Sequence, residues 1–362
     1  MSKYFLALVF STGCGFLSKS EEENEEDGSE ATAEDEEVNY STEHECPFTP
    51  ISGTKMSSYD CNPVFESTGE SWADELGSFG FYSSPETGHM MWYTSYPEDQ
   101  PYGMGLATSA NGSEWTVSVE NPLLQEETGA WDQDSLSGQT IVWDEIESEY
   151  LMLYQGFNLS DNIWGMGVAT SPDGIIWTKS EANPVINFTE EFDLFSGFSP
   201  CWPLTLTADE RGVLRGYIAV SAVDFEGGES KCEIYAMSGL SATDWVIDTN
   251  SPVMEAGSSY DSKGFSGASI VEFEGVLYMF YIGFSEWVQY DGYQTVSNPS
   301  LNLATSTNGG ETWTRDSNNP LPITAPQSIG AQRVNERIHL WVKKENNTIN
   351  YYFFNPNIED HE

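Results

Sequence analysis

The fold is indicated most clearly by Ala169-Thr-Ser-Pro-Asp-Gly-Ile-Ile-Trp177, which is followed by Asn183-Pro184. A tryptophan followed six residues later by Asn-Pro or Ser-Pro occurs four times, at Trp115, Trp177, Trp245 and Trp313. Successive tryptophans stand 62, 68 and 68 residues apart, and three of the four copies carry Ala-Thr-Ser upstream. Self-similarity at a fixed spacing indicates stacked copies of one supersecondary unit.

Each unit is predicted to consist of short strands joined by tight turns. Runs such as Tyr150–Tyr154 and Leu277–Tyr281 are aromatic or aliphatic and too short for helices. Ser171-Pro-Asp-Gly174 has turn chemistry, because glycine tolerates a positive φ. Four antiparallel strands in about 65 residues make one blade of a β-propeller.

The two ends of the repeat region complement each other. After four complete units, Ser328–Phe354 offers three strands but no strand that carries the Trp and Asn-Pro signature. Asn62-Pro63-Val64-Phe65 is the missing piece, and it precedes the first full unit. An N-terminal strand that completes the last blade would remove free sheet edges. We therefore predict an all-β fold, a five-bladed β-propeller closed by an N-terminal strand, over residues 46–356, with residues 357–362 as a tail.

The first 45 residues have a different character. Lys3 precedes an apolar run, Tyr4–Phe10, which ends at Ser11-Thr-Gly-Cys14 and resembles a bacterial lipoprotein signal. Residues 1–19 would then be the signal and lipid attachment region, with lipid on Cys14. Residues 20–45 are acidic and cannot bury enough apolar surface to order, so we expect a disordered tether. These features predict a lipoprotein of the bacterial cell envelope, at the outer membrane or cell surface, attached to the membrane through its lipid.

The charge restricts the partners. The chain has 58 acidic residues against 13 Lys+Arg, a formal net charge of −45. Nucleic acid is therefore a poor partner, since its recognition depends on cationic contacts to phosphate. Clustered arginines, which a sialidase needs for its carboxylate substrate, are missing from the segments that lead into the blades. We expect a monomer that binds neutral carbohydrate.

Five cysteines fit an exported protein. If Cys14 carries lipid, the other four allow three connectivities, which the sequence alone does not decide. Local pairing, Cys46–Cys61 and Cys201–Cys232, would fix the closing strand and the third blade. No Cys/His spacing suggests zinc, whereas a calcium ion in the central channel suits a ring of Asp and backbone carbonyls.

Loops of two kinds share one face of a propeller: those that lead into the first strand of each blade, and those between the second and third strands. The first kind carries an aromatic residue followed by an acid, at Trp72 with Asp74, Trp131 with Asp132 and Asp134, Phe192 with Asp193 and Tyr260 with Asp261. The second kind carries the acidic segment 224–229 and a long aromatic segment, 284–296, with Glu286, Trp287 and Tyr290. Aromatic faces beside carboxylates suit a sugar ring and its hydroxyls. The candidate sugar ligands are Trp72, Trp131, Asp193, Asp261, Glu286, Trp287 and Tyr290. A motif repeated in four blades can equally be structural, capping each blade.

Residues 169–177 with Asn183-Pro184-Val-Ile186 resemble the blade repeat of the five-bladed propeller glycosidases, such as arabinanases, β-xylosidases, invertases and levansucrases. The resemblance covers about residues 60–355. It implies a catalytic Asp in blade one, an Asp in blade two and a Glu in blade three. Here Gly138, Gly267 and, in blade one, Phe79-Gly80 stand at such positions, so the usual carboxylates are not evident. If catalysis is retained, we expect Asp74 as base, Asp134 as its electrostatic partner and Glu226 as acid.

Two functions follow from this sequence. The first is an envelope-anchored glycosidase that acts on neutral oligo- or polysaccharide through a carboxylate pair at the channel mouth. The second is a non-catalytic propeller that binds glycan or a protein. A buried carboxyl pair with one strongly perturbed member would favour the enzyme. A mouth lined by Ser and Gly, with all acids exposed, would favour recognition.

Overall fold

Every secondary-structure element that the computed structural model describes is a β-strand, in agreement with the period-two pattern of apolar residues. The described residues are 43–70, 72–73, 75–95, 102–188, 198–208, 214–222, 231–241, 243–248, 252–290 and 293–358. For 198–204, 208, 221–222, 240, 289–290 and 293–296 only the backbone is described. The predicted signal, Cys14 and residues 20–42 of the predicted tether lie outside these ranges. Residues 43–45 of the tether are described, and Glu43 and His44 contact the fold: the Glu43 carbonyl accepts from the Asn111 side chain at 2.9 Å, and His44 lies 3.2 Å from the Ser113 hydroxyl. Within the described part of the chain, no helix is long and apolar enough to cross a membrane.

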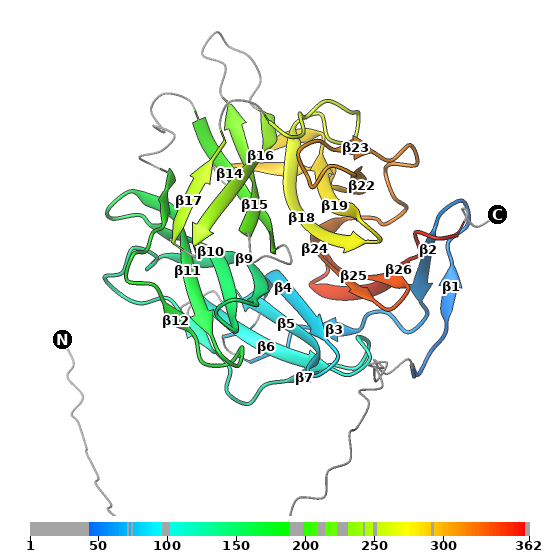
Figure 1. Cartoon of the computed structure of the whole chain (residues 1–362), viewed down its shortest axis with the longest axis horizontal. Helices are drawn as coiled ribbons and strands as arrows, with labels where there is room; N and C mark the ends of the chain where they lie inside the picture. Colours follow the sequence, from blue (N-terminus) through cyan, green and yellow to red (C-terminus); the bar gives the residue numbers. More distant parts are fainter. Residues whose placement is uncertain are drawn as a thin grey trace, which may run out of the picture. The chain divides into compact units, whose positions relative to one another are not determined.

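The strands form antiparallel meanders, in which the main strands of a unit pair in chain order, and in the first two units a last short strand pairs back with the third strand (Figure 1). The first comprises β4 (Leu76–Ser84), β5 (Gly88–Ser95), β6 (Gly103–Ser109), β7 (Thr116–Val117) and β8 (Leu124–Gln125). The second comprises β9 (Ser135–Asp144), β10 (Glu149–Asn158), β11 (Ile163–Ser171), β12 (Thr178–Lys179) and β13 (Ile186–Asn187). The third comprises β14 (Phe198–Ala208), β15 (Leu214–Ala222), β16 (Lys231–Ser241) and β17 (Asp244–Ile247).

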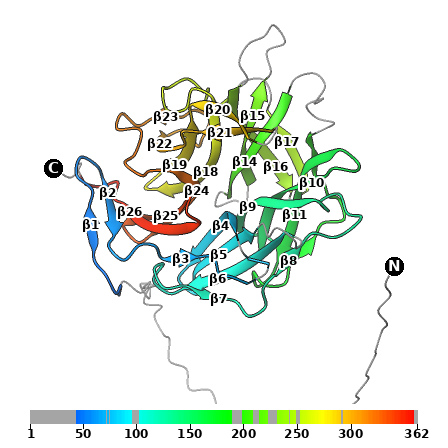
Figure 2. The ribbon, with the colours of Figure 1, turned by 180° about the vertical axis from the view of Figure 1, so that it is seen from behind.

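The remaining strands continue the pattern. The fourth meander comprises β18 (Gly264–Phe273), β19 (Val276–Phe284), β22 (Ser300–Ser306) and β23 (Thr314–Arg315). The segment between β19 and β22 forms a separate hairpin of β20 (Glu286–Tyr290) and β21 (Tyr293–Ser297), both marked in Figure 2. The last meander comprises β24 (Pro326–Val334), β25 (Arg337–Lys344) and β26 (Thr348–Phe354). The first strands of the meanders contact one another in a cycle, from β4 to β9, β14, β18, β24 and back to β4.

The N-terminal segment joins the last meander, as predicted. β2 (Met56–Tyr59) pairs with β26 on one side and with β1 (Phe48–Pro50) on the other, and β3 (Phe65–Glu66) also pairs with β26. The predicted disulfide Cys46–Cys61 is present, with its Cα atoms 5.7 Å apart. It closes the loop that carries β1 and β2. Cys232 is also disulfide-bonded, but the side chain of Cys201 lies outside the described residues, so that pairing stays a prediction.

The Asn-Pro signature has a structural explanation. The Asn183 side chain accepts a hydrogen bond from the Val168 amide at 2.8 Å and donates one to the Val168 carbonyl at 2.9 Å. This two-way contact fastens the strand after the tryptophan to the third strand of its meander. Asn62 makes the same pair of bonds to Tyr351 of β26, at 2.6 and 3.0 Å. The N-terminal segment therefore supplies the last unit with the piece that other units contain in sequence.

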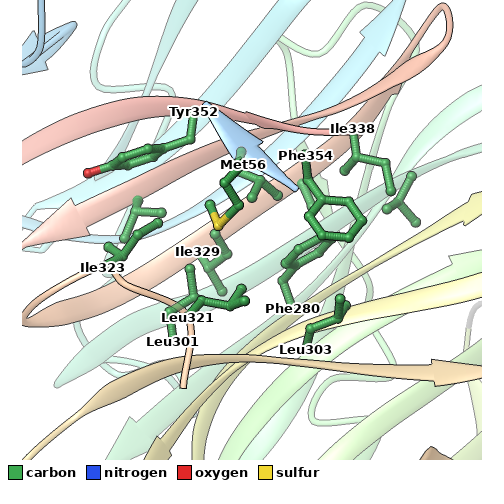
Figure 3. Packing of buried hydrophobic residues seen from close by; sticks show 14 of the residues in the cluster. Met56, Phe280, Leu301, Leu303, Leu321, Ile323, Ile329, Ile338, Tyr352 and Phe354 are labelled. Carbon is green, nitrogen blue, oxygen red and sulfur yellow. The ribbon is translucent and has the colours of Figure 1, made fainter. Parts of the chain in front are cut away.

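The hydrophobic core lies between the faces of successive meanders. One cluster joins the fourth and last meanders around Phe280, Leu301, Ile338 and Phe354, and Met56 from β2 inserts into it (Figure 3). Met56 is fully buried. Because the N-terminal strand contributes to this core as well as to the sheet, its loss would expose apolar surface on the neighbouring unit.

Candidate functional site

A pocket of about 590 Å³ lies where the first strands of four meanders begin. Its wall is formed by short segments of β4, β9, β18 and β24: Gly77-Ser78-Phe79, Ser137-Gly138-Gln139, Ser266-Gly267-Ala268 and Pro326-Gln327-Ser328-Ile329. Its other lining residues come from the second strands or from the loops before the third strands: Gln155, Ser297, Asn298, Pro299, Lys343 and Glu345. Most of the lining therefore belongs to the strands themselves, and only Asn298, Pro299 and Glu345 come from the loops before the third strands.

Each of the four wall segments carries a β-bulge. In β4, the pairing register with β5 shifts between Leu76 and Phe79. In β9, the register with β10 shifts in the same way around Gly138. Comparable shifts occur at Ser266 and at Gln327. A bulge bends the strand and turns its extra residue out of the regular alternation. The bulges therefore direct small polar residues toward the pocket at one level.

Two wall residues hold neighbouring meanders together. The Ser78 hydroxyl donates to Gln139 Oε1 at 3.0 Å and accepts from the Gly138 amide at 2.8 Å. The Gln139 amide nitrogen donates to the carbonyls of Ser78 and Trp92, at 3.1 and 2.9 Å. Gln139 is 4% exposed, and these bonds use both ends of its side chain. This part of the wall is rigid and has few donors left for a ligand.

Other wall residues retain hydrogen-bonding capacity. The side chains of Ser137, Gln155, Ser266 and Ser328 make no hydrogen bond within the described part of the chain. A hydroxyl donates one bond and accepts two, and a primary amide does both at separate atoms. The pocket can therefore bind a ligand that presents several hydroxyl groups.

One cation lies in the same wall. Lys343 is 6% exposed and donates from Nζ to the side-chain oxygen of Gln327 at 2.5 Å. Burial lowers the pKa of Lys343, an effect that the negative charge of Glu75 partly opposes. Among the described lining residues the only carboxylate is Glu345, which is exposed. The described wall thus contains no buried carboxyl pair.

No protein-family model matches this sequence, and no curated protein matches it. Solved structures do match. One similar structure is reported for the GH130 family of mannoside phosphorylases, which contains glycoside hydrolases that target β-1,2-mannosidic linkages in Candida mannan. Its TM-score is 0.60 at 14% sequence identity, and the alignment covers 88% of this chain and 96% of that chain. A glycosyl hydrolase from Bacteroides ovatus gives the same four values. A thermostable family-43 glycoside hydrolase has a TM-score of 0.56 at 12% identity and covers 80% of this chain and 91% of its own. The fold is that of the propeller-type glycosidases.

In this glycosidase fold, Gly138 and Gly267 line the pocket, at the positions where the resemblance implies catalytic carboxylates. Gly138 has a φ of 61°, which glycine adopts readily and aspartate does not. A Cβ added at Gly267 would meet only Ile282, at 3.7 Å. At both positions the wall offers backbone and open space in place of an acid.

The aromatic–acid pairs that the structure describes belong to the packing of their units. Asp261, a predicted sugar ligand, is fully buried and forms an ion pair with Arg315 at 2.8 Å. Asp132 is equally buried and pairs with Lys179 at 2.7 Å. Neither aspartate lines the pocket. Asp132 and Asp261 are therefore each paired with a base of their own unit, which favours the structural alternative for these two acids.

The predicted aromatic ligands of the first two meanders also pack inside the fold. Trp72 is 8% exposed and donates from its indole nitrogen to Glu70 at 2.7 Å. Trp131 fills the space above Gly156, where an added Cβ would come within 2.4 Å of the ring. Neither ring is part of the pocket wall. Asp134, the predicted electrostatic partner, accepts a hydrogen bond from the Leu159 amide at 2.7 Å and does not line the pocket either.

The predicted binding segment 284–296 is a hairpin beside the pocket. Trp287 is half-buried and packs on Phe284 with ring centroids 4.8 Å apart, whereas Glu286 is exposed. The hairpin ends at Ser297, which lines the pocket. The side chain of Tyr290 lies outside the described residues.

Three further predicted residues cannot be placed. Asp74, Asp193 and Glu226 lie outside the described residues, so their roles stay predictions. Among the described residues, no group of His, Cys, Asp or Glu side chains is arranged to hold a metal ion, so the calcium prediction gains no ligand set. Sequence reasoning missed Lys343, Gln139 and Gln327, which are unrepeated residues inside or beside expected strands.

Proposed function

We propose that this chain is a five-bladed propeller whose mouth binds carbohydrate. The cyclic contacts of the first strands and the pairing of β2 with β26 support five blades closed by the N-terminal strand. The observation that carries the function is the pocket at the blade ends, where unpaired hydroxyl and amide groups face open space. Sugar rings present many hydroxyls, and the unpaired hydroxyl and amide groups of this wall can bind them.

Recognition is favoured over hydrolysis by the composition of the wall. Glycoside hydrolysis ordinarily needs two carboxyl groups, one on each side of the scissile bond. The described wall has the single exposed Glu345, and glycine at the two positions where acids are expected. This matches the mouth lined by Ser and Gly that distinguished the two hypotheses.

Hydrolysis is the second candidate, because the solved structures of this fold listed above are named as glycoside hydrolases. Its acids would be Asp74, Asp134 and Glu226. An inverting reaction would need the base and the acid roughly 6.5–9.5 Å apart. Turnover that is abolished by Glu226→Gln would establish this candidate.

We also propose attachment to the bacterial cell envelope through lipid on Cys14. A chain with Cys14→Ala should then leave the membrane fraction and appear in the soluble fraction. Equal membrane association of the two forms would contradict the anchor.

The binding proposal is tested by filling the pocket. Gly267→Leu places a side chain in the wall without a close contact, and Gly257→Leu is its matched control, since no atom lies within 4 Å of the added Cβ there. Calorimetry against a panel of oligosaccharides should show binding to the wild type and to Gly257→Leu, and loss of binding in Gly267→Leu. Retained binding in Gly267→Leu would place the sugar elsewhere.

A further inference from the structure

We propose that the saccharide bound at this mouth is acidic, and that Lys343 receives its carboxylate. The inference rests on the proposed function, and it narrows the ligand from sugars in general to those that carry a uronic acid. It differs from the neutral ligand that the scarcity of arginine in the sequence suggested. One buried ammonium in the pocket wall is enough to reverse that preference.

Lys343 is buried without a counter-ion. Its only hydrogen-bond partner among the described residues is the neutral side-chain oxygen of Gln327, and no described carboxylate lies within 4.0 Å of its ammonium group. An ammonium has three donors, so two remain unused. Burying a charge costs free energy unless an opposite charge or hydrogen bonds compensate it. An anionic ligand group would supply that compensation.

The position of Gln327 favours a carboxylate. Because its side-chain oxygen accepts from Lys343, its amide nitrogen is directed away from the ammonium and donates to no described residue. The ammonium and this amide are adjacent donors on one wall of the pocket. A carboxylate has two acceptor oxygens, and it can accept from both groups at once. The hydroxyls of Ser266 and Ser328 remain for the rest of the sugar ring.

The acidic surface does not oppose this binding strongly. In the described part of the chain, Glu75 acts on Lys343 and Glu345 lines the same pocket, and both side chains are exposed. Water and salt screen exposed charges beyond roughly 8 Å at physiological ionic strength. A charge-assisted hydrogen bond inside the pocket is screened much less, so the local cation decides the preference.

The test compares each acid with its own neutral form. The probes are short oligosaccharides of galacturonic, glucuronic and mannuronic acid, together with their methyl esters, and affinity is measured by calorimetry. We expect the wild type to bind one acid form at least about tenfold more tightly than its ester. In Lys343→Met, the ratio of the affinity for the acid to the affinity for its ester should be close to one. The affinity for the ester should equal that of the wild type. The matched control is Lys344→Met, because Lys344 is the next residue on β25 and does not line the pocket.

The failures can be told apart. A ratio near one in the wild type, with sugar binding retained, overturns this inference and leaves the proposed function standing. No binding of any acid or ester overturns both. Lys343→Met removes a buried charge, so we expect it to fold with an unchanged or higher melting temperature. Should it not fold, the wild type alone decides: its affinity for the acid must fall as pH rises through the lowered pKa of Lys343, while that for the ester stays constant.

Discussion

Exchange of Asp261 for asparagine tests whether the repeated aromatic–acid pairs hold the fold or bind sugar. The carboxylate is fully buried, and both oxygens are in use. One oxygen accepts from the amides of Gly257 and Ser258, at 3.2 and 2.7 Å. The other accepts from Tyr281 Oη at 3.1 Å and from Arg315 Nε at 2.8 Å. An asparagine keeps one acceptor oxygen and turns an NH₂ group toward two donors.

The expected cost follows from these contacts. Breaking a buried ion pair by removing one partner costs about 3 to 5 kcal/mol, because an uncompensated charge remains. The Arg315 side chain is 24% exposed, so water relieves part of that charge. We therefore expect Asp261→Asn to lower the free energy of unfolding by about 3 kcal/mol.

Asp132→Asn is the matched comparison. Asp132 pairs with Lys179 and accepts from Tyr154 through one oxygen, whereas its other oxygen has no hydrogen-bond partner among the described residues. The NH₂ group of an asparagine can take that second position without facing a donor. The loss of stability should therefore be smaller than for Asp261→Asn, about 1 to 2 kcal/mol for the lost charge.

Urea unfolding of the wild type and the two variants measures these costs, and calorimetry with the bound saccharide measures function. We expect lower unfolding midpoints, unchanged m-values and unchanged saccharide affinity at temperatures where the variants are folded. Loss of saccharide binding in Asp261→Asn, with destabilisation below about 1 kcal/mol, would refute the anchor role and restore Asp261 as a sugar ligand.

Three further outcomes are expected. His89 is buried, which lowers its pKa from 6.5 to about 4, so its contribution to stability is complete above pH 6.5 and is lost as pH falls toward 4; because burial also lowers the pKa values of His44 and His339, both proteins lose stability over that range in urea titrations, and the wild type should lose about 3 kcal/mol more than His89→Gln. Deletion of residues 1–42 should leave the melting temperature unchanged, because the described contacts of the N-terminal segment begin at Glu43 and His44, whereas deletion of residues 1–65 should lower it strongly, since it removes β2, Phe65 of β3 and the Asn62 contact. Gly174→Ala should destabilise by more than Gly53→Ala, because both have a φ of 74° but only at Gly174 would the new Cβ meet a tryptophan ring, at 2.7 Å; equal losses would argue against close packing there.

The architecture was predictable because the contacts that build it are repeated. Each Asn-Pro needs the same two-way bond to a third strand, so the same dipeptide returns at a constant distance from its tryptophan. Trp177 donates to the Gly174 carbonyl of its own turn at 3.0 Å, and Trp92 of the preceding meander donates to the same oxygen at 2.7 Å. Residues that make the same contact in each unit therefore recur at a regular spacing in the sequence.

The pocket was not predictable in the same way. Lys343 and Gln327 occur once, and their meeting depends on a bulge that shifts the register of β24 by one residue. Alternation along a strand cannot reveal that shift, because one extra residue exchanges the inward and outward faces. The neutral-ligand prediction relied on counting cations along the chain, and a count carries no information about burial.

The aromatic–acid pairs left a signal that sequence reasoning could have used. Lys179 and Arg315 each stand two residues after the repeated tryptophan of their unit. They occur in the units whose leading segments carry Asp132 and Asp261, and the ion pairs join these positions. The first unit has neither member, with Ala73 in place of the aspartate and Val117 in place of the base. In these three units, an acid directly after the leading aromatic residue and a base two residues after the tryptophan are therefore present or absent together.

The third unit breaks this correlation. Asp193 stands 52 residues before Trp245, the same spacing that separates Asp261 from Trp313, yet Ile247 occupies the position of the base. Asp193 itself lies outside the described residues and is compared with Asp261 by sequence position alone. Because no base stands at position 247, Asp193 has no partner there for the kind of ion pair that Asp261 forms with Arg315, and such a pair does not explain its presence. Of the repeated acids, Asp193 is thus the strongest remaining candidate for contact with the sugar, and its exchange for asparagine should weaken binding with little loss of stability, the reverse of Asp261→Asn.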